Sequence, residues 1–276
     1  DFLVIGTGAA GVSAALYASS AGHSVMLCEK ASKIGGTTAL SNAMIWIPCS
    51  DHAIAAGIDD SIEKARTYLR GELGDYYDEK KIEAYLEYGP TAVSQIEKIS
   101  DIKFVLAGAP DYHSNKEGGV DKGRALSPAP FDGRKLKKDF DLIGDPIRVV
   151  LGGMMITSSE IKYFLNPIKS VKALFHVLRR VCRYIFDRMR FSRGTELSGG
   201  NAFLAAALTS IRKFKINLST ESTLRELIIK DDRVTGAIIA HNASDIRVKA
   251  KYGVILATGG FAANPVLRKN IGAKHQ

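Results

Sequence analysis

The first thirty residues of the chain combine two short apolar runs with a helical pattern between them. Residues 2–5 and 24–28 are apolar runs of the length and composition of buried parallel strands. Between these runs, Val12 and Leu16 recur at helical spacing, and Gly22 is placed to end the helix. The pattern predicts strand, helix and strand in succession, which is the opening of an α/β domain.

The C-terminal part of the chain changes to the spacing of β-strands. Residues 223–229, 234–240 and 245–251 predict three short antiparallel strands, a β-meander. The apolar run "GVILATGGF" (253–261) follows and predicts a buried strand that ends in Gly259 and Gly260.

The middle of the chain predicts helices over residues 59–71 and 78–99, followed by a loop-rich stretch, 106–147. A loop of that length in a compact domain is usually functional or disordered. In the second helix the apolar residues recur at helical spacing, and we expect core positions rather than ligand contacts there. They are Ile82, Tyr85, Leu86, Val93 and Ile96.

Composition limits the class of protein. The 276 residues are 46% hydrophobic and 24% charged, which suits a soluble protein with a substantial core. Cys28, Cys49 and Cys182 are odd in number and form no CxxC pair, so we expect no disulfide framework, no metal site and a cytoplasmic location. No apolar run reaches transmembrane length. The chain begins without Met at an apolar run, and we expect it to be a segment of a longer protein.

The formal charge of +9 is concentrated in one place. Residues 161–193 contain nine basic residues and one acidic residue, Asp187, so this segment carries nearly the whole excess. The charge therefore belongs to one local element, and we expect no nucleic-acid partner.

A glycine fingerprint lies at the turn between the first strand and the first helix. Gly6, Gly8 and Gly11 form GxGxxG, in which Gly6 permits a tight turn, Gly8 lets backbone touch a pyrophosphate and Gly11 lets the helix pack on the strand. The start of the helix would face the phosphates. Glu29, at the end of the second strand, is placed to accept hydrogen bonds from ribose hydroxyls.

A GxGxxG pattern alone is a weak indication, but here a strand precedes it, a helix follows and an acid lies about 20 residues on. We therefore predict a dinucleotide site; the alternative is a glycine-rich turn without a ligand. Glu29 argues against a 2′-phosphate, and hence against NADP.

The stretch after Glu29 favours FAD over NAD. A simple NAD unit would continue into another crossover helix, whereas this chain enters Gly35-Gly36-Thr37-Thr38. At this point the sequence resembles the flavoproteins of the fumarate reductase and 3-ketosteroid dehydrogenase superfamily, which carry GxGxxG, a Glu-Lys pair and then two glycines and hydroxyl residues. "GGTTALSNAMIWIP" (35–48) looks most like the 3-ketosteroid Δ1-dehydrogenase branch, although Ser41-Asn42-Ala43 stands where that family often has Ser-Gly-Gly.

The resemblance implies FAD as cofactor and a set of residues that bind it. It places Leu224 beside the adenine and residues 257–260 along the pyrophosphate; the alternative for Gly259 and Gly260 is a plain strand-ending turn. The implied cofactor-binding residues are Gly6, Gly8, Ala9, Ala10, Gly11, Glu29, Lys30, Gly35, Gly36, Thr37, Thr38, Ser41, Asn42, Leu224, Ala257, Thr258, Gly259 and Gly260.

The resemblance also implies the fold. It predicts an FAD-binding, Rossmann-like domain of the two-dinucleotide-fold type with a β-meander, whose core is residues 1–50 and 197–265. Residues 51–196 would be an inserted region of helices and loops. The family's substrate domain would follow Gln276, so the resemblance covers nearly the whole chain but about half of a family member.

The long loop resembles the active-site loop of the steroid branch. It contains Asp-Tyr-His at 111–113, Gly118-Gly119, Gly123-Arg124 and the phrase "PAPFDGR" (128–134). By that resemblance Tyr112 is catalytic and assists proton removal; the alternative is an exposed loop tyrosine. A phenol near pKa 10 is a poor base at neutral pH, so it would need a partner or a favourable site. We expect His113 to be a solvated loop residue.

The resemblance implies an FAD-dependent dehydrogenase acting on a small apolar, steroid-like ketone. A base removes the proton α to the carbonyl, hydride leaves the adjacent carbon for flavin N5, and an external electron acceptor reoxidises the flavin. One alternative is a fumarate or succinate-type reductase, and another is a non-catalytic flavin-binding, membrane-associated module.

Residues 166–190 predict a basic amphipathic helix, with Asn166 as cap and Pro167 in the first position. Four basic residues lie off its apolar stripe: Lys172, Arg179, Arg183 and Arg190. Such a helix can lie at a bilayer surface, which predicts peripheral membrane contact; the alternative is a helix packed on its own domain with a solvated basic face. The stripe comprises Ile168, Val171, Leu174, Phe175, Leu178, Val181, Cys182, Ile185, Phe186 and Met189.

Overall fold

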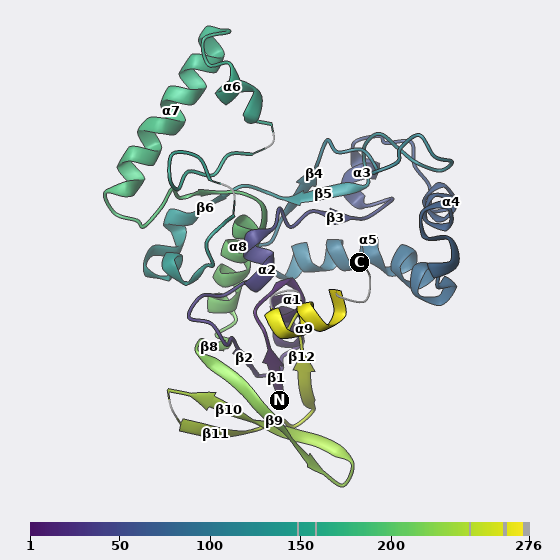
Figure 1. Cartoon of the computed structure of the whole chain (residues 1–276), viewed down its shortest axis with the longest axis vertical. Coiled ribbons are helices and arrows are strands. Elements are labelled where there is room, and N and C mark those ends of the chain that lie inside the picture. Colours follow the sequence, from purple (N-terminus) through teal and green to yellow (C-terminus); the bar gives the residue numbers. More distant parts are fainter. Residues whose placement is uncertain (148, 158, 243, 262–263, 273–276) are drawn as a thin grey trace. The chain divides into compact units, whose positions relative to one another are not determined.

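The computed structural model describes residues 1–147, 149–157, 159–242, 244–261 and 264–272, which form a mixed α/β structure (Figure 1). The chain divides into two compact units, one comprising Asp1–Thr37 and Ile216–Gln276 and the other Thr38–Lys215. The sequence predicts a Rossmann core of residues 1–50 and 197–265. Two parts of it, 38–50 and 197–215, fall in the second unit. The division into units does not define the Rossmann core, so the predicted domain bounds stay a prediction.

The first unit is built on a parallel sheet in the order β12-β1-β2-β8. In the centre of the sheet, Val4 lies opposite Leu27 on one side and Ile255 on the other. Leu3 and Val4 are buried, as expected for a strand covered on both faces. The strands of this sheet are β1 (Phe2–Ile5), β2 (Val25–Cys28), β8 (Asn217–Ser219) and β12 (Gly253–Leu256).

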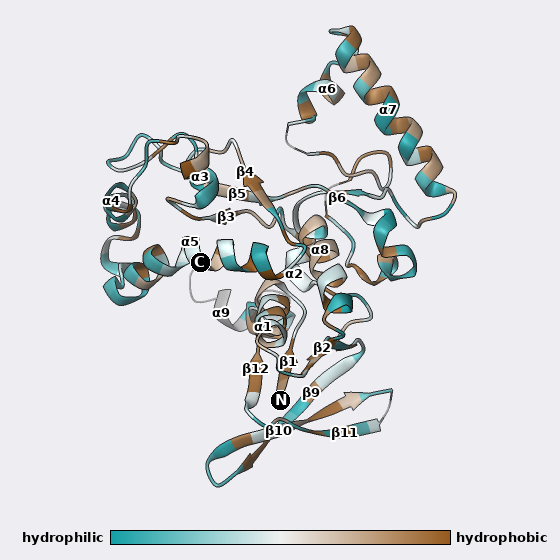
Figure 2. Cartoon of the chain, turned by 180° about the vertical axis from the view of Figure 1, so that it is seen from behind, coloured by the Kyte–Doolittle hydropathy of each residue, from teal (hydrophilic) through white to brown (hydrophobic). Residues whose placement is uncertain are grey.

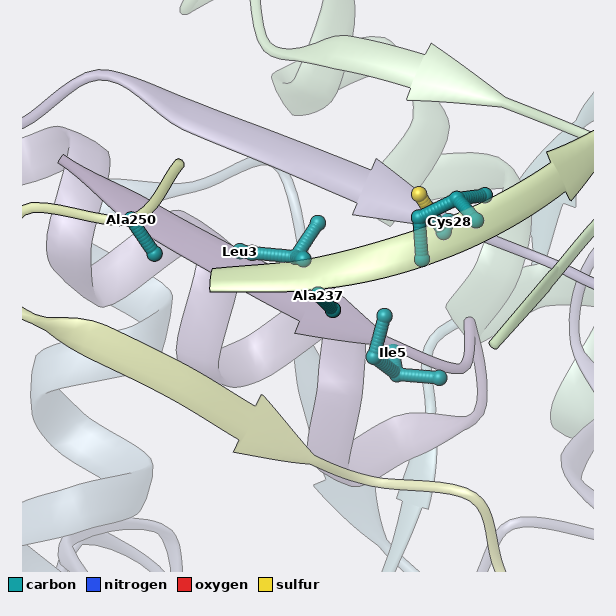
Figure 3. Packing of buried hydrophobic residues seen from close by; sticks show 6 residues of the cluster. Leu3, Ile5, Cys28, Ala237 and Ala250 are labelled. Carbon is teal, nitrogen blue, oxygen red and sulfur yellow. The ribbon is translucent and has the colours of Figure 1, made fainter. Parts of the chain in front are cut away.

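A helix and a β-meander complete the first unit. Helix α1 (Ala9–Ser20) contacts β1, β2 and β12. Leu3 and Ile5 instead pack with Cys28, Ala237 and Ala250, so the meander covers this face of the sheet (Figure 3). The remaining elements are β9 (Ser222–Lys230), β10 (Arg233–His241), β11 (Ser244–Lys249) and α9 (Pro265–Gly272). The predicted strand–helix–strand opening, the meander and the position of the final strand are confirmed. The expectation that the final strand is buried is wrong, because β12 is only half-buried and Leu256 at its end is exposed.

The second unit is centred on helix α8, whose residues are buried along most of its length and which contacts β5, β6, β7 and η2. One antiparallel sheet has the order β3-β5-β4, and β6 pairs with β7. Helix α2 (Gly36–Leu40) crosses the boundary between the units. The elements of the second unit are β3 (Ile45–Trp46), α3 (Asp51–Ala55), α4 (Ile62–Leu73), η1 (Gly74–Tyr76), α5 (Glu79–Ile99), β4 (Phe104–Leu106), β5 (Ala125–Pro128), β6 (Phe131–Asp132), η2 (Gly133–Leu142), α6 (Ile161–Leu165), α7 (Val171–Arg188), β7 (Glu196–Leu197) and α8 (Gly199–Lys213).

Several expectations for the middle of the chain need correction. Residues 106–147 contain β5, β6 and η2, so the expected long loop is partly ordered into regular structure. Tyr85 is not a core residue of α5, because the residue is 42% exposed and its hydroxyl donates to the carbonyl oxygen of Trp46. The basic helix begins at Val171 rather than near Asn166, because the hydroxyl of Ser170 caps it by accepting from the Ala173 amide at 3.1 Å.

Candidate functional site

The glycine fingerprint lies at the edge of the sheet where three parallel strands end. Gly6 follows β1, Glu29 follows β2 and Ala257 follows β12. The Gly6 amide donates to the Cys28 carbonyl at 2.8 Å, and the Ala257 amide donates to the Ile5 carbonyl at 2.8 Å. In open α/β sheets, ligands bind in the crevice outside the carboxyl ends of the strands, which is where these residues meet.

Two of the fingerprint glycines are required by packing. Gly6 has φ +104°, and a Cβ there would lie 2.3 Å from the carbonyl oxygen of Ala257. A Cβ on Gly11 would lie 1.8 Å from the carbonyl oxygen of Gly6. A side chain at either position would push the turn, the helix or β12 aside, so these glycines hold the turn close to the neighbouring strand.

The start of α1 has the features that favour a bound anion. Gly8 is its N-cap and supplies no side-chain hydrogen bond, and the first turn contains no acidic residue. Ala9 and Ala10 are exposed. The amides of a helix N-terminus and the helix dipole favour a negatively charged group at such a position.

Glu29 is buried, and its carboxylate supports the glycine turn. Its oxygens accept from the Thr7 amide at 3.2 Å, from the Ala31 amide at 3.1 Å and from the Thr7 hydroxyl. The Thr7 hydroxyl in turn accepts from the Gly35 amide at 2.9 Å, so Thr7 links the two glycine-rich segments. Sequence analysis missed Thr7, although a hydroxyl residue between two fingerprint glycines was visible. A carboxylate has about four acceptor sites and Glu29 accepts the three hydrogen bonds named above, so it can still accept one from a ribose hydroxyl.

The remaining candidates of the first unit differ in exposure. Lys30, Thr37 and Thr258 are exposed, whereas Gly35 is buried and Leu224 is half-buried against the core. A Cβ built on any of three exposed glycines would meet no heavy atom within 4 Å, so the surface beside the sheet edge is open there. These glycines are Gly36, Gly259 and Gly260.

Thr38, Ser41 and Asn42 lie in the second unit, against the start of α8. The Gly200 amide donates to the Ser41 carbonyl at 3.0 Å, and a Cβ on Gly200 would lie 1.7 Å from the Thr38 carbonyl oxygen. The Asn201 side chain donates to the Ala39 carbonyl at 2.9 Å. Gly200 and Asn201 were missed; the sequence signal was the pair Gly199-Gly200 before a helical run.

The loop that carries Tyr112 is anchored by a buried residue next to it. Tyr112 is 100% exposed, whereas Asp111 is buried and accepts from the indole nitrogen of Trp46 at 2.6 Å. The tryptophan of the 35–48 stretch therefore holds the Tyr112 loop. His113 is exposed, but its ring lies 2.8 Å from the Glu72 carboxylate, so it is tied to α4 rather than freely solvated.

Within the described part of the chain, no three His, Cys, Asp or Glu side chains gather as a metal site. In the same residues, no helix combines the length and apolar character needed to span a bilayer.

Three features define a dinucleotide-binding domain. They are a tight glycine turn on packed backbone, a helix that starts at a glycine without an acidic residue in its first turn, and an acid after the second strand. The open surface at Gly36, Gly259 and Gly260 fits close approach by a long cofactor. The chain belongs to the FAD binding domain family, which it matches over residues 1–275. The fold class and the cofactor expected from the sequence, FAD, are thereby confirmed.

The chain is similar in sequence to two dehydrogenases, and similar in structure to a third. The chain is 37% identical over 98% of its length to the 4-oxocyclohex-2-ene-1-carboxylate 5-dehydrogenase of Sinomonas cyclohexanicum, covering 46% of that protein. It is 31% identical over 97% of its length to the 3-oxosteroid 1-dehydrogenase of Mycolicibacterium smegmatis, covering 48% of it.

Among solved structures, the 3-ketosteroid Δ1-dehydrogenase of Sterolibacterium denitrificans in complex with 1,4-androstadiene-3,17-dione is similar with a TM-score of 0.86 and 28% identity. That similarity covers 98% of this chain and 49% of the dehydrogenase. The chain thus spans about half the length of the relatives that it matches.

Proposed function

We propose that the protein containing this chain is an FAD-dependent dehydrogenase that introduces a carbon–carbon double bond beside the carbonyl of a 3-ketosteroid-like ring. The observation that carries the proposal is the similarity to the steroid dehydrogenase structure over nearly the whole chain. The loop sequence around Tyr112 supports the same branch.

The bound FAD would supply the hydride acceptor. In this chain the start of α1 and the glycines at the sheet edge would hold the cofactor's phosphates, and Glu29 keeps the first glycine turn in place. Tyr112 presents its hydroxyl on an exposed loop and would assist a base in removing the proton from the carbon α to the carbonyl. An external electron acceptor takes up the electrons afterwards.

A second substrate class is a monocyclic keto acid, since the Sinomonas relative shares 37% identity with this chain. Turnover of the whole protein with an artificial acceptor should be compared on a 3-ketosteroid and on 4-oxocyclohex-2-ene-1-carboxylate. A higher kcat/KM for the steroid supports the proposal; a higher value for the keto acid assigns the smaller ring. Fumarate reduction by the reduced protein, with no turnover of either ketone, would favour the fumarate reductase alternative.

We also propose that helix α7 contacts a membrane surface peripherally, because its apolar side faces outward. Val171 is 85% exposed, Phe175 69% and Met189 75%. In Figure 2 the apolar and polar colours alternate along this helix. Apolar residues of this density on an exposed helix suit insertion into a bilayer interface.

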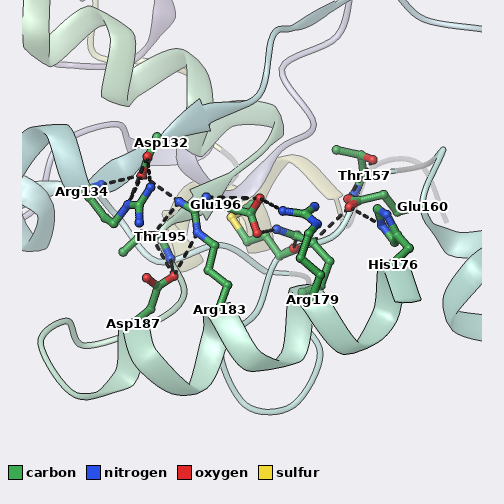
Figure 4. A network of polar contacts seen from close by, with 12 residues as sticks. Asp132, Arg134, Thr157, Glu160, His176, Arg179, Arg183, Asp187, Thr195 and Glu196 are labelled. Carbon is green, nitrogen blue, oxygen red and sulfur yellow. Dashed lines mark hydrogen bonds and ion pairs between the residues drawn. The ribbon is translucent and has the colours of Figure 1, made fainter. Parts of the chain in front are cut away.

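The charged residues around α7 explain this orientation. The Arg180 guanidinium is 4% exposed, lies 3.0 Å from the Glu160 carboxylate and pairs with Glu196. Arg183 donates to Asp132 at 2.8 Å (Figure 4). In the alternative, a helix packed on its own domain, the basic face would be solvated. Arg180 and Arg183 depart from this, because carboxylates of the same unit pair with them.

Other cations of this region remain exposed and suit an anionic surface, each contributing about 1 kcal/mol near such a membrane. They include Lys169, Lys172, Arg188 and Arg190.

Flotation with vesicles of phosphatidylserine and phosphatidylcholine tests the membrane proposal. We expect the whole protein to float with the vesicles at low salt. The double variants Phe175→Ser/Phe186→Ser and Lys172→Glu/Arg188→Glu should remain in the dense fraction. Ile229→Ser and Lys230→Glu, on exposed positions of β9, are the matched controls and should float. Absence of flotation at low salt contradicts the proposal, and so does flotation that the α7 variants leave unchanged.

A further inference from the structure

A buried guanidinium holds two carboxylates beneath the Tyr112 loop. The side chain of Arg124 is 1% exposed, that of Asp60 3% and that of Asp111 2%. Asp60 accepts from Arg124 Nε at 2.8 Å and from its Nη2 at 2.6 Å, so this pair is bidentate. The remaining side of the guanidinium donates to Asp111 at 2.9 Å.

Asp111 ties the loop to two other segments and to itself. Its carboxylate accepts from the indole of Trp46 on β3, from Arg124 before β5, and from the Val120 amide at 3.1 Å. The Asp111 amide donates to the Val120 carbonyl at 3.0 Å, which closes the loop on itself. These bonds fix both the backbone and the side chain at position 111.

Aromatic rings wall this cluster. The Arg124 guanidinium lies 5.4 Å from the centre of the Trp46 ring and 5.7 Å from that of Tyr68. The two rings stack with centroids 6.2 Å apart. Water is therefore kept from the ion pairs, and a buried charge that loses its partner there is expensive.

The loop is also held beyond Tyr112. His113 contacts Glu72, and Lys116 pairs with the same carboxylate at 2.8 Å. A Cβ on Gly118 would lie 2.2 Å from the Lys64 carbonyl oxygen, so the loop packs closely on α4. Tyr112 is thus an exposed residue between two anchored neighbours, not the tip of a free loop.

We infer that Asp111, held by Arg124 and Trp46, is a positioning residue that aims the Tyr112 hydroxyl at the reacting carbon. Replacing a buried ion cluster with apolar side chains is often neutral or stabilising, so core stability alone does not account for two acids around one base. The need to fix the direction of the neighbouring Tyr112 side chain does account for this cluster. The inference rests on the proposed role of Tyr112.

The test is a double-mutant cycle in the whole protein, with Asp111→Asn, Tyr112→Phe and the double variant. A hydrogen bond to a charged group contributes enough that we expect kcat to fall about tenfold in Asp111→Asn, with KM within about twofold and flavin retained. In the Tyr112→Phe background the same change should have no further effect on kcat. Asp59→Asn, next to Asp60 but exposed, is the matched control and should keep wild-type turnover.

Each outcome decides one point. An unchanged kcat in Asp111→Asn, or an equal fall in both backgrounds, overturns the positioning role while Tyr112 keeps its own. Wild-type turnover in Tyr112→Phe overturns the role of Tyr112 and the inference with it. If Asp111→Asn does not fold, Trp46→Phe removes the indole donor to Asp111 while it keeps an aromatic ring beside Arg124. It should then show the same non-additivity with a fall of about threefold, and an additive effect counts against the inference.

Discussion

The backbone of Gly6 approaches Ala257 so closely that a Cβ on Gly6 would lie 2.3 Å from the Ala257 carbonyl oxygen. This contact joins the ends of β1 and β12 at the edge where the candidate cofactor residues meet. Gly8 is different, because its φ of −67° and ψ of 179° are open to any residue. A side chain added at Gly6 should therefore disturb the fold, whereas a side chain added at Gly8 should disturb only the binding of a ligand.

Gly8→Val should weaken FAD binding at least about tenfold, since the added side chain would block backbone approach to the pyrophosphate. Flavin absorbance of the purified protein and titration of the apoprotein measure the effect. Circular dichroism should show an intact fold in Gly8→Val, whereas Gly6→Val should be destabilised. Ala21→Val, at the far end of α1, is the matched control. A Gly8→Val protein that keeps a full complement of flavin would contradict the assignment.

Arg124→Met should destabilise the protein by about 3–5 kcal/mol, because it leaves the buried Asp60 and Asp111 carboxylates without a cation. Burial alone lowers the pKa of Arg124, but hydrogen bonds and charges of the two carboxylates outweigh it and raise the pKa, so the guanidinium stays charged. Urea unfolding measures the loss. Arg225→Met, on the exposed side of β9, should cost less than about 1 kcal/mol. A similar small cost for Arg124→Met would show that the cluster is not needed for stability.

The first unit was predictable from sequence because its determinants are local. The apolar run of β1, the glycines of the turn and the alternation of the meander each lie within about ten residues, and each specifies one conformation. The cofactor followed from the same short segments, with Gly35-Gly36 deciding between the two dinucleotides.

The buried cluster could not be predicted in the same way. Trp46, Asp60, Asp111 and Arg124 are far apart in sequence, and their meeting depends on how β3, the start of α4 and β5 pack. Each was visible as a residue of the right type, but a single sequence contains no information on which acid pairs with which base.

The orientation of α7 shows the same limit. Its periodicity was clear, but the side that faces the protein was decided by Asp132, Glu160 and Glu196, which lie outside the helix. Amphipathicity alone favours the apolar side as the buried one, and here the ion pairs reverse that choice.

Glu160 should make the attachment of α7 sensitive to acid. Burial alone raises the pKa of its carboxyl, but the Thr157 amide and the Arg180 charge outweigh it and hold the pKa below its ordinary 4.5. A lowered pKa contributes stability that is present above pH 4.5 and is lost as the pH falls through the folded-state value.

Glu160→Gln should therefore lose about 2 kcal/mol near neutral pH and show a shallower fall in stability below about pH 4.5 than the wild type. Thermal unfolding across this range measures both effects. Glu226→Gln, on an exposed position of β9, should follow the wild-type profile. Parallel profiles for Glu160→Gln and wild type would show that Glu160 does not stabilise the folded protein through its charge.

The account centres on ring-ketone oxidation by FAD with proton transfer through Tyr112, and anaerobic mixing of the whole protein with a 3-ketosteroid tests it most directly. The account predicts that the visible flavin absorbance bleaches in a single turnover. In Tyr112→Phe the bleaching should be about 10²–10⁴-fold slower, because help with proton transfer is lost while flavin stays bound. Flavin that stays oxidised with the steroid and with the monocyclic keto acid, or a Tyr112→Phe protein that bleaches at the wild-type rate, would contradict the account.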